Sequence, residues 1–169
     1  MLMSEKMQHT LSGLVGECFA MNRFLDRCMS LLDTKFKLKR CAKFLHPALA
    51  HAFTGDDFAD GISTYMGQRD TLVVYPATPI GDEDFNTPQE IFAAFYLKMI
   101  EFQSMVYDAI EDAEEEQDHT TKVFLDGFMM TVMKYTDQAQ TLVDISNAYG
   151  NTPLGLQLMD SNIKKYITV

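Results

Sequence analysis

Apolar side chains recur every three or four positions over most of the chain, which is the spacing of amphipathic helices. In a first segment, about 7–32, the apolar positions are Leu11, Leu14, Cys18, Met21, Leu25, Cys28 and Leu32. A later segment carries Phe92, Phe95, Met99, Phe102, Val106, Ala109 and Ala113. The segment at about 120–148 carries Phe124, Phe128, Thr131, Tyr135, Leu142 and Ile145. The pattern predicts an all-α chain built from long helices.

Local signals set the ends of these helices. A second helical stretch contains His46-Pro47 and then Thr54-Gly55-Asp56-Asp57, so it is predicted as two pieces, 36–52 and 56–67. The sequence Thr87-Pro88-Gln89-Glu90 has the form of a capping box with proline at the first helical position. Tyr149-Gly150-Asn151 should stop the last long helix. Residues 153–166 are then predicted as a short fifth helix.

The segment between the second and third helices indicates the topology. Residues 67–86 contain Pro76, Pro79 and Gly81, and the short run Leu72–Tyr75 has no partner strand, so an extended connection is expected. A helix of roughly 28 residues is about 42 Å long, and a 20-residue extended segment reaches about 66 Å. The connection can therefore run the length of a bundle. The sequence predicts a single domain, 1–169, that forms a four-helix bundle with one long crossover.

Composition narrows the possible partners. The net charge of −10 opposes nucleic-acid binding, which needs clustered cations. The basic stretch between Lys35 and Lys43 is interpreted as a solvated face or a subunit contact. No apolar run is long enough for a membrane span, and the three cysteines are expected to be reduced and buried in a cytoplasmic protein. Surplus apolar residues predict a homo-oligomer, at least a dimer: Phe19, Phe24, Leu31 and Tyr96.

Four stretches, taken in order, resemble the ferritins over nearly the whole chain. They are the first-helix segment beginning at Glu17, the Asn-Thr-Pro-Gln-Glu start of the third helix, the turn 113–118 followed by Phe124-Leu125, and the tail 156–160. The resemblance implies a bundle that holds two irons through carboxylates and a histidine. It also offers two interpretations of the acidic run at 111–118, which is either a solvated turn or a cation-collecting patch at a subunit pore.

Few of the implied iron ligands are present. Glu17 matches a ligand position, whereas the other positions fall at Met99, at Thr131-Val132 and in the interruption 47–55. Asp57 and Asp60 share a helical face; they suit either the first turn of a helix, capped by Thr54 or Asp56, or a cation. His51 is a further candidate ligand, and His46 is five residues away, a poor spacing for one face. The metal candidates are therefore Glu17, His51, Asp57 and Asp60.

Two functions follow from this pattern. One is an iron-binding or iron-storing ferritin-like protein in which iron is held weakly or not at all and ferroxidase activity is slight or absent. The other is a non-enzymatic structural or interaction bundle that has lost its metals, because Met99, Thr131 and Val132 stand where ligands are expected. Phosphate-loop and nucleophile-elbow motifs are not found.

Overall fold

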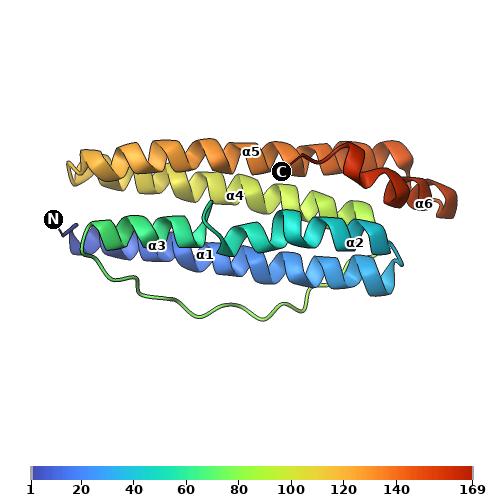
Figure 1. Ribbon diagram of the computed structural model, residues 1–169, viewed down its shortest axis with the longest axis horizontal. Helices are drawn as coiled ribbons and strands as arrows, with labels where there is room; N and C mark the ends of the chain where they lie inside the picture. The colour runs from blue at the N-terminus through green and yellow to red at the C-terminus, as the bar shows by residue number, and fades with distance from the viewer. Residues whose placement is uncertain (1, 169) are drawn as a thin grey trace.

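The computed structural model describes residues 2–168, all of whose regular elements are helical. The α-helices are α1 (Glu5–Ser30), α2 (Lys39–Leu45), α3 (Ala59–Gln68), α4 (Pro88–Glu115), α5 (His119–Tyr149) and α6 (Pro153–Asn162). The helices α4 and α5 pack as one pair, and α1 packs along the row formed by α2 and α3 (Figure 1). The predicted all-α four-helix bundle is confirmed, and so is the short fifth helix, α6.

Side chains from the sequence cap the long helices. Ser4 Oγ accepts a hydrogen bond from the Met7 amide at the start of α1. At the start of α4, the Glu90 amide donates to Thr87 Oγ1, while Glu90 Oε2 accepts from the amide of Asn86 rather than of Thr87. The predicted capping box is present, with its return bond displaced by one residue. At the end of α5, Gly150 has φ 79°, a left-handed conformation that glycine adopts without strain.

The second helical stretch is interrupted as predicted, but in a more complex way. A π-helical turn, His46–Ala50, follows α2, and a 3₁₀ turn, His51–Thr54, follows that turn. The chain then leaves the helical path at Gly55 and re-enters it at α3. The N-cap of α3 is Phe58, without a side-chain hydrogen bond. The expected cap at Thr54 or Asp56 is therefore wrong, because the extra residues after Gly55 place the helix start further along the chain.

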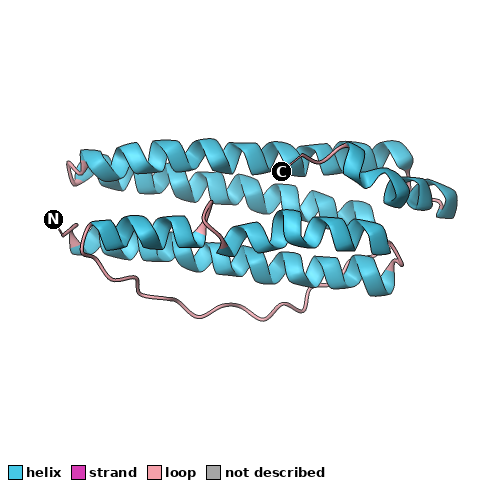
Figure 2. Ribbon diagram, in the orientation of Figure 1, coloured by secondary structure: helices cyan, strands magenta, loops and turns pink. Residues whose placement is uncertain are grey.

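A single long crossover links α3 to α4 and runs along the outside of the bundle (Figure 2). It lies on α1, where Gln8 Nε2 donates to the Leu72 carbonyl at 2.8 Å and the Val74 amide donates to Ser12 Oγ at 3.0 Å. The ring of Tyr75 meets the ring of Phe19 edge-on. The extended connection predicted from the sequence is thus confirmed.

The core is a column of apolar side chains between the helices. Every apolar position predicted to face inward on α1 and α4 is buried. On α5 the prediction is partly wrong, because Phe124, Thr131 and Ile145 are only half-buried. Phe128, Tyr135 and Leu142 are buried as predicted, and the other buried apolar residues of α5 are Leu125, Met129, Val132 and Ala139. Among residues 2–168, no helix has both the length and the apolar character needed to cross a membrane.

The C-terminal helix α6 is fixed to the bundle by a buried carboxylate. Asp160 is 6% exposed, and its Oδ1 accepts a hydrogen bond from the backbone amide of Cys41 at 2.8 Å. Cys41 lies in the first turn of α2, whose own N-cap residue, Leu38, supplies no side-chain bond. Asp160 therefore caps α2 from a distant part of the sequence, and the helix dipole favours its negative charge.

Candidate functional site

The interior of the bundle is occupied by a cluster of aromatic rings. Phe53 stacks on Phe58 with ring centroids 4.2 Å apart, and Tyr135 meets Phe58 edge-on at 5.0 Å. Phe102 from α4 and Phe128 from α5 complete this aromatic cluster. All five rings are buried. The edge-on and stacked contacts are the arrangements that favour aromatic pairs beyond simple burial, so the cluster is a packed core.

Two of the three interior positions that correspond to ligands by resemblance are buried and apolar. Met99 and Val132 are completely buried, and Thr131 is half-buried. A thioether and an aliphatic chain supply none of the hard oxygen ligands that iron needs. At the edge of the aromatic cluster, Asp57 hydrogen-bonds Tyr135; burial and the Asp57 carboxylate both raise the pKa of the Tyr135 hydroxyl.

Glu17 lies outside this interior, beneath the crossover. It is half-buried and lines a pocket of about 130 Å³ together with Arg23, Lys98 and Glu83. Glu83 belongs to the crossover, and its Oε2 is buried without a hydrogen-bond partner among the described residues. A buried carboxylate oxygen without a donor is unfavourable, so it favours a water molecule or a cation at this place. Sequence reasoning missed Glu83 because an extended segment has no helical spacing that marks which residues point inward.

The other predicted ligands do not join Glu17. Asp57 and Asp60 are both exposed, and Asp60 lies in the first turn of α3, where the helix dipole favours a negative charge. His51 is exposed and contacts His46, with ring centroids 4.2 Å apart, rather than the two aspartates. Within residues 2–168, no three His, Cys, Asp or Glu side chains are close enough together to hold a metal ion.

The contact of His46 with His51 was not expected from their spacing. Residues five apart lie on different sides of an α-helix, but the π-helical turn places the His51 amide in a hydrogen bond to the His46 carbonyl. The sequence signal that was available is the proline after His46, which marks a disturbed helix without specifying its hydrogen-bond pattern.

Comparison with known proteins identifies the fold and the family. The sequence model of the family described as the ferritin-like domain matches residues 43–148, more than half of the chain. The chain belongs to the ferritin-like domain family. No curated protein matches the sequence significantly.

Solved ferritin structures superpose on almost the whole ferritin-like chain. An open-pore ferritin from the hyperthermophilic archaeon Archaeoglobus fulgidus aligns with a TM-score of 0.87 at 17% identity, covering 95% of this chain and 96% of that chain. A form of the same ferritin engineered to be closed gives 0.86 at 16% identity, with 99% of both chains covered. A humanized archaeal ferritin gives 0.88 at 16% identity, again with 99% of both covered. These similarities establish the fold.

The residues in the interior of this ferritin-like bundle do not fit a dinuclear iron centre. Such a centre needs several carboxylates and an imidazole directed between the helices. Here the corresponding space holds the aromatic cluster, Met99 and Val132, and Glu17 lies in the pocket beneath the crossover. The side chains of the bundle interior are therefore unsuited to binding a pair of iron ions.

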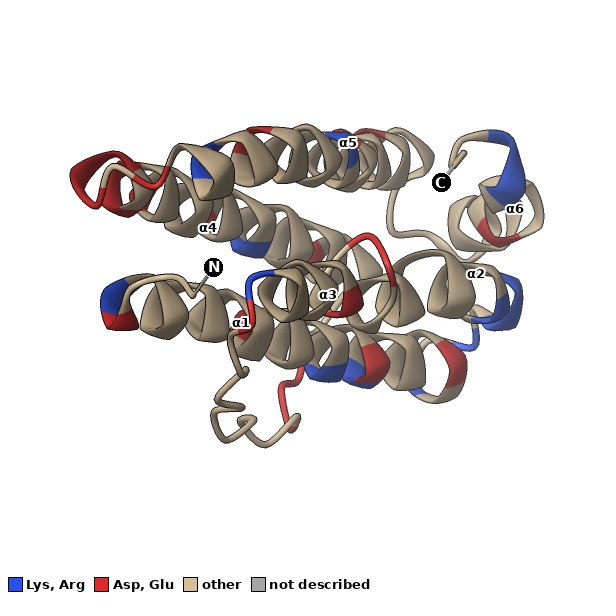
Figure 3. Cartoon of the chain, turned by 60° about the vertical axis from the view of Figure 1, so that its left-hand side comes forward, with Lys and Arg blue, Asp and Glu red and all other residues tan. Residues whose placement is uncertain are grey.

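Acidic residues gather at the turn between α4 and α5 (Figure 3). Several of them are already paired: Lys6 Nζ lies 2.6 Å from Glu115 and 3.4 Å from Asp112, and Lys122 lies 3.9 Å from Glu114. The Glu115 and Asp112 carboxylates raise the pKa of the Lys6 amine. Exposed pairs of this kind contribute little to stability, and they leave this end of the ferritin-like bundle predominantly negative.

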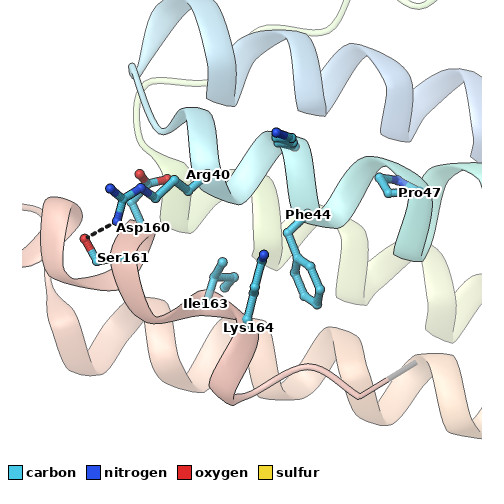
Figure 4. Close-up of a pocket in the computed structure, with 8 residues that line it drawn as sticks. Arg40, Phe44, Pro47, Asp160, Ser161, Ile163 and Lys164 are labelled. Carbon is cyan, nitrogen blue, oxygen red and sulfur yellow. Dashed lines mark hydrogen bonds between the residues drawn. The ribbon is translucent and has the colours of Figure 1, made fainter.

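Basic residues gather instead between α2 and α6. A pocket of about 470 Å³ is lined by Arg40 and Lys43 from α2 and by Lys164 after α6, with Phe44 as an apolar wall (Figure 4). Arg40 donates to Ser161 Oγ at 3.4 Å, and the Lys164 amine lies over the Phe44 ring. Two residues of the basic stretch predicted as a solvated face or subunit contact, Arg40 and Lys43, therefore line a pocket.

The three cysteines take no part in these sites. Cys18, Cys28 and Cys41 are free and buried, and burial raises the pKa of each thiol above its ordinary value. A buried thiol that stays protonated is a poor nucleophile and metal ligand, so these cysteines serve as small apolar core residues.

Proposed function

We propose that this ferritin-like chain is a non-enzymatic, self-associating subunit whose bundle interior provides packing and does not oxidise iron. The observation that carries the proposal is the aromatic cluster of Phe53, Phe58, Phe102, Phe128 and Tyr135, which fills the space between the helices. Opening that space for metal ions and oxygen would require removal of closely packed rings, and core packing of this kind is costly to disrupt.

Iron oxidation measured under air tests the proposal. Fe(II) is added to the purified protein in small excess over subunits, and Fe(III) formation is followed by absorbance beside a protein-free control. We expect equal rates in both samples. The melting temperature is also expected to be the same with and without EDTA, because a dry apolar interior gains nothing from a bound metal. Faster oxidation with protein, or a lower melting temperature in EDTA, would contradict the proposal.

A second candidate function is weak iron binding without oxidation, favoured by the pocket beneath the crossover. Glu17 lines this pocket, and the buried Oε2 of Glu83 belongs to it. The neighbouring Arg23 and Lys98 oppose a cation there through their positive charges. The pocket is therefore suited to a weakly held cation, and the acidic turn beyond α4 would attract cations to the surface.

Metal analysis distinguishes the two candidates. The parent and the Glu17→Ala, Glu83→Gln and Glu101→Ala variants are incubated with Fe(II), desalted and analysed for iron. Glu101 is exposed on α4 and does not line the pocket, so it serves as the control. Iron retained by the parent and by Glu101→Ala, and lost in the other two variants, would establish binding at the pocket. Equal and negligible iron in all four samples supports the structural function alone.

Self-association and cytoplasmic location complete the proposal. The chain exposes large apolar side chains along the crossover and the outer faces of α4 and α5, more than an isolated bundle needs. The similar archaeal ferritins are described as open-pore and closed forms. Three free, buried cysteines agree with a reducing compartment.

A further inference from the structure

The π-helical turn after α2 brings two imidazoles together on the bundle surface. His46 begins this turn and His51 follows it, and the His51 amide hydrogen-bonds the His46 carbonyl five residues back. The two ring centroids are 4.2 Å apart at an interplanar angle of 61°. The side chain of His46 is 41% exposed and His51 is exposed, so both rings can be reached from solvent.

A carboxylate from α1 orients one of these rings. Asp26 Oδ1 lies 2.8 Å from His46 Nε2. An ionised carboxylate only accepts hydrogen bonds, so Nε2 of His46 carries the proton and donates it. In the neutral imidazole the other nitrogen, Nδ1, then bears the free lone pair. A carboxylate that fixes the tautomer of a histidine and raises its basicity is a common partner of metal-binding histidines.

There is room for an ion and its waters beside His46. A hollow of about 380 Å³ borders His46 and Asp26 but not His51, and Asp33, Met29 and Lys43 also line it. Lys39, on the same rim, is paired with Asp33 at 3.1 Å, which reduces its positive charge toward the hollow. The pair is distinct from the pocket at Glu17 and from the bundle interior, and it includes only one of the residues first considered as metal ligands, His51.

We propose that His46 and His51 bind a zinc ion, with Asp26 as the residue that positions the His46 ring. The ion would take one nitrogen from each imidazole and complete its coordination with water, since no third His, Cys, Asp or Glu joins the two within residues 2–168 in a metal-binding arrangement. Imidazole ligands favour zinc and copper over the harder ions that carboxylates prefer. Manganese should therefore bind much more weakly than zinc at this place.

The chain provides its own controls, because its other histidines, His9 and His119, are both exposed and lie elsewhere. Zinc is titrated into the full chain in competition with a chromogenic indicator. The titration is repeated with His46→Gln, His51→Gln, His9→Gln, His119→Gln and Asp26→Asn. We expect the two variants of the pair to weaken the tightest zinc site at least about tenfold and Asp26→Asn to weaken it about tenfold, with the two control variants matching the parent.

Nuclear magnetic resonance of the parent chain, labelled with ¹⁵N in its histidine rings, gives a readout that does not depend on any variant. Zinc should shift the ring nitrogens of two of the four histidines, assigned to His46 and His51 by comparison with the variants. Before zinc is added, the His46 ring should be in the Nε2–H tautomer. The proposal is overturned if His46→Gln and His51→Gln bind zinc as the parent does, or if the shifted rings are those of His9 or His119.

Discussion

At the scale of single residues, Asp118 joins three parts of the chain. Its carboxylate caps α5 by accepting from the amide and the hydroxyl of Thr121, and it accepts from Arg69, at the start of the crossover, at 3.0 Å. Thr121 also shares a hydrogen bond with Tyr65 of α3. Burial alone would raise the pKa of Asp118, but the hydrogen bonds from Arg69 and Thr121 outweigh it, and the pKa is lowered below its ordinary value.

Replacing Asp118 with asparagine should therefore destabilise the protein in a pH-dependent way. We expect a loss of about 1–3 kcal/mol in the free energy of unfolding at neutral pH, because a charge-assisted bond to Arg69 is removed. A carboxylate with a lowered pKa stabilises the fold fully above the ordinary aspartate pKa. That contribution is lost as the pH falls below about 5 toward the folded-state pKa. The difference between parent and variant should shrink over this range.

Urea unfolding at a series of pH values measures this effect. Asp108→Asn, on the exposed side of α4, is the matched control and should follow the parent at every pH. A constant difference between parent and Asp118→Asn down to low pH would show that the stabilisation does not depend on ionisation of Asp118.

The sequence marked Glu17 as a candidate residue, but it did not reveal which residues Glu17 and His46 contact. Glu17 was singled out from the sequence by its match to a ligand position, and in the structure its half-buried side chain lines a pocket with Glu83. The partner could not be predicted, because Glu83 lies in an extended segment where no periodicity relates it to α1. The contact of His46 with His51 was not predicted either, because it depends on a π-helical turn and the spacing was judged for an α-helix.

At the scale of elements, the position of the crossover depends on a glycine of α1. A methyl group built on Gly16 would lie 2.5 Å from Pro76 Cγ, whereas one built on Gly13 meets nothing within 4 Å. Both glycines are inside the same helix, so alanine adds the same intrinsic helix propensity at each, about 1 kcal/mol. The two substitutions differ in the contact with the crossover alone.

Gly13→Ala should therefore stabilise the protein, and Gly16→Ala should be less stable than Gly13→Ala by about 1–3 kcal/mol, the range for overpacking a closely fitted contact. Urea unfolding gives the difference, and limited proteolysis shows whether the crossover near Pro76 becomes more accessible in Gly16→Ala alone. Equal stabilities of the two variants would mean that the crossover is not held against α1 at this point.

Element boundaries were predictable where the chain carries explicit signals. The proline and cap before α4 and the glycine after α5 gave their ends, and the apolar stripes of α1 and α4 gave their buried faces. The buried face of α5 was harder to identify from the sequence, because apolar residues such as Met130 and Met133 also lie on its exposed side. The break in the second helix was visible at Pro47 and Gly55, but the π and 3₁₀ turns that form it have no distinctive composition.

At the scale of the whole molecule, one surface is unusually apolar for a chain of net charge −10. The crossover exposes Leu72, Tyr75 and Ile80 at 81%, 61% and 80% of their surface. Apolar side chains grouped in this way mark an interaction surface more often than isolated ones do. Negative charge opposes association of identical chains, and salt screens that repulsion. Association of this protein should therefore strengthen as ionic strength rises.

The double substitution Leu72→Ser with Tyr75→Ser tests whether the crossover carries that association. Sedimentation velocity at micromolar concentration is expected to show the parent as a dimer or larger and the double variant as a smaller species, because burial of these two side chains contributes about 1.5–3 kcal/mol each. Leu97→Ser, on the outer face of α4 and 60% exposed, tests the other exposed apolar face separately. If Leu97→Ser dissociates while the double variant keeps the parental mass, subunits meet through α4 and the crossover faces solvent.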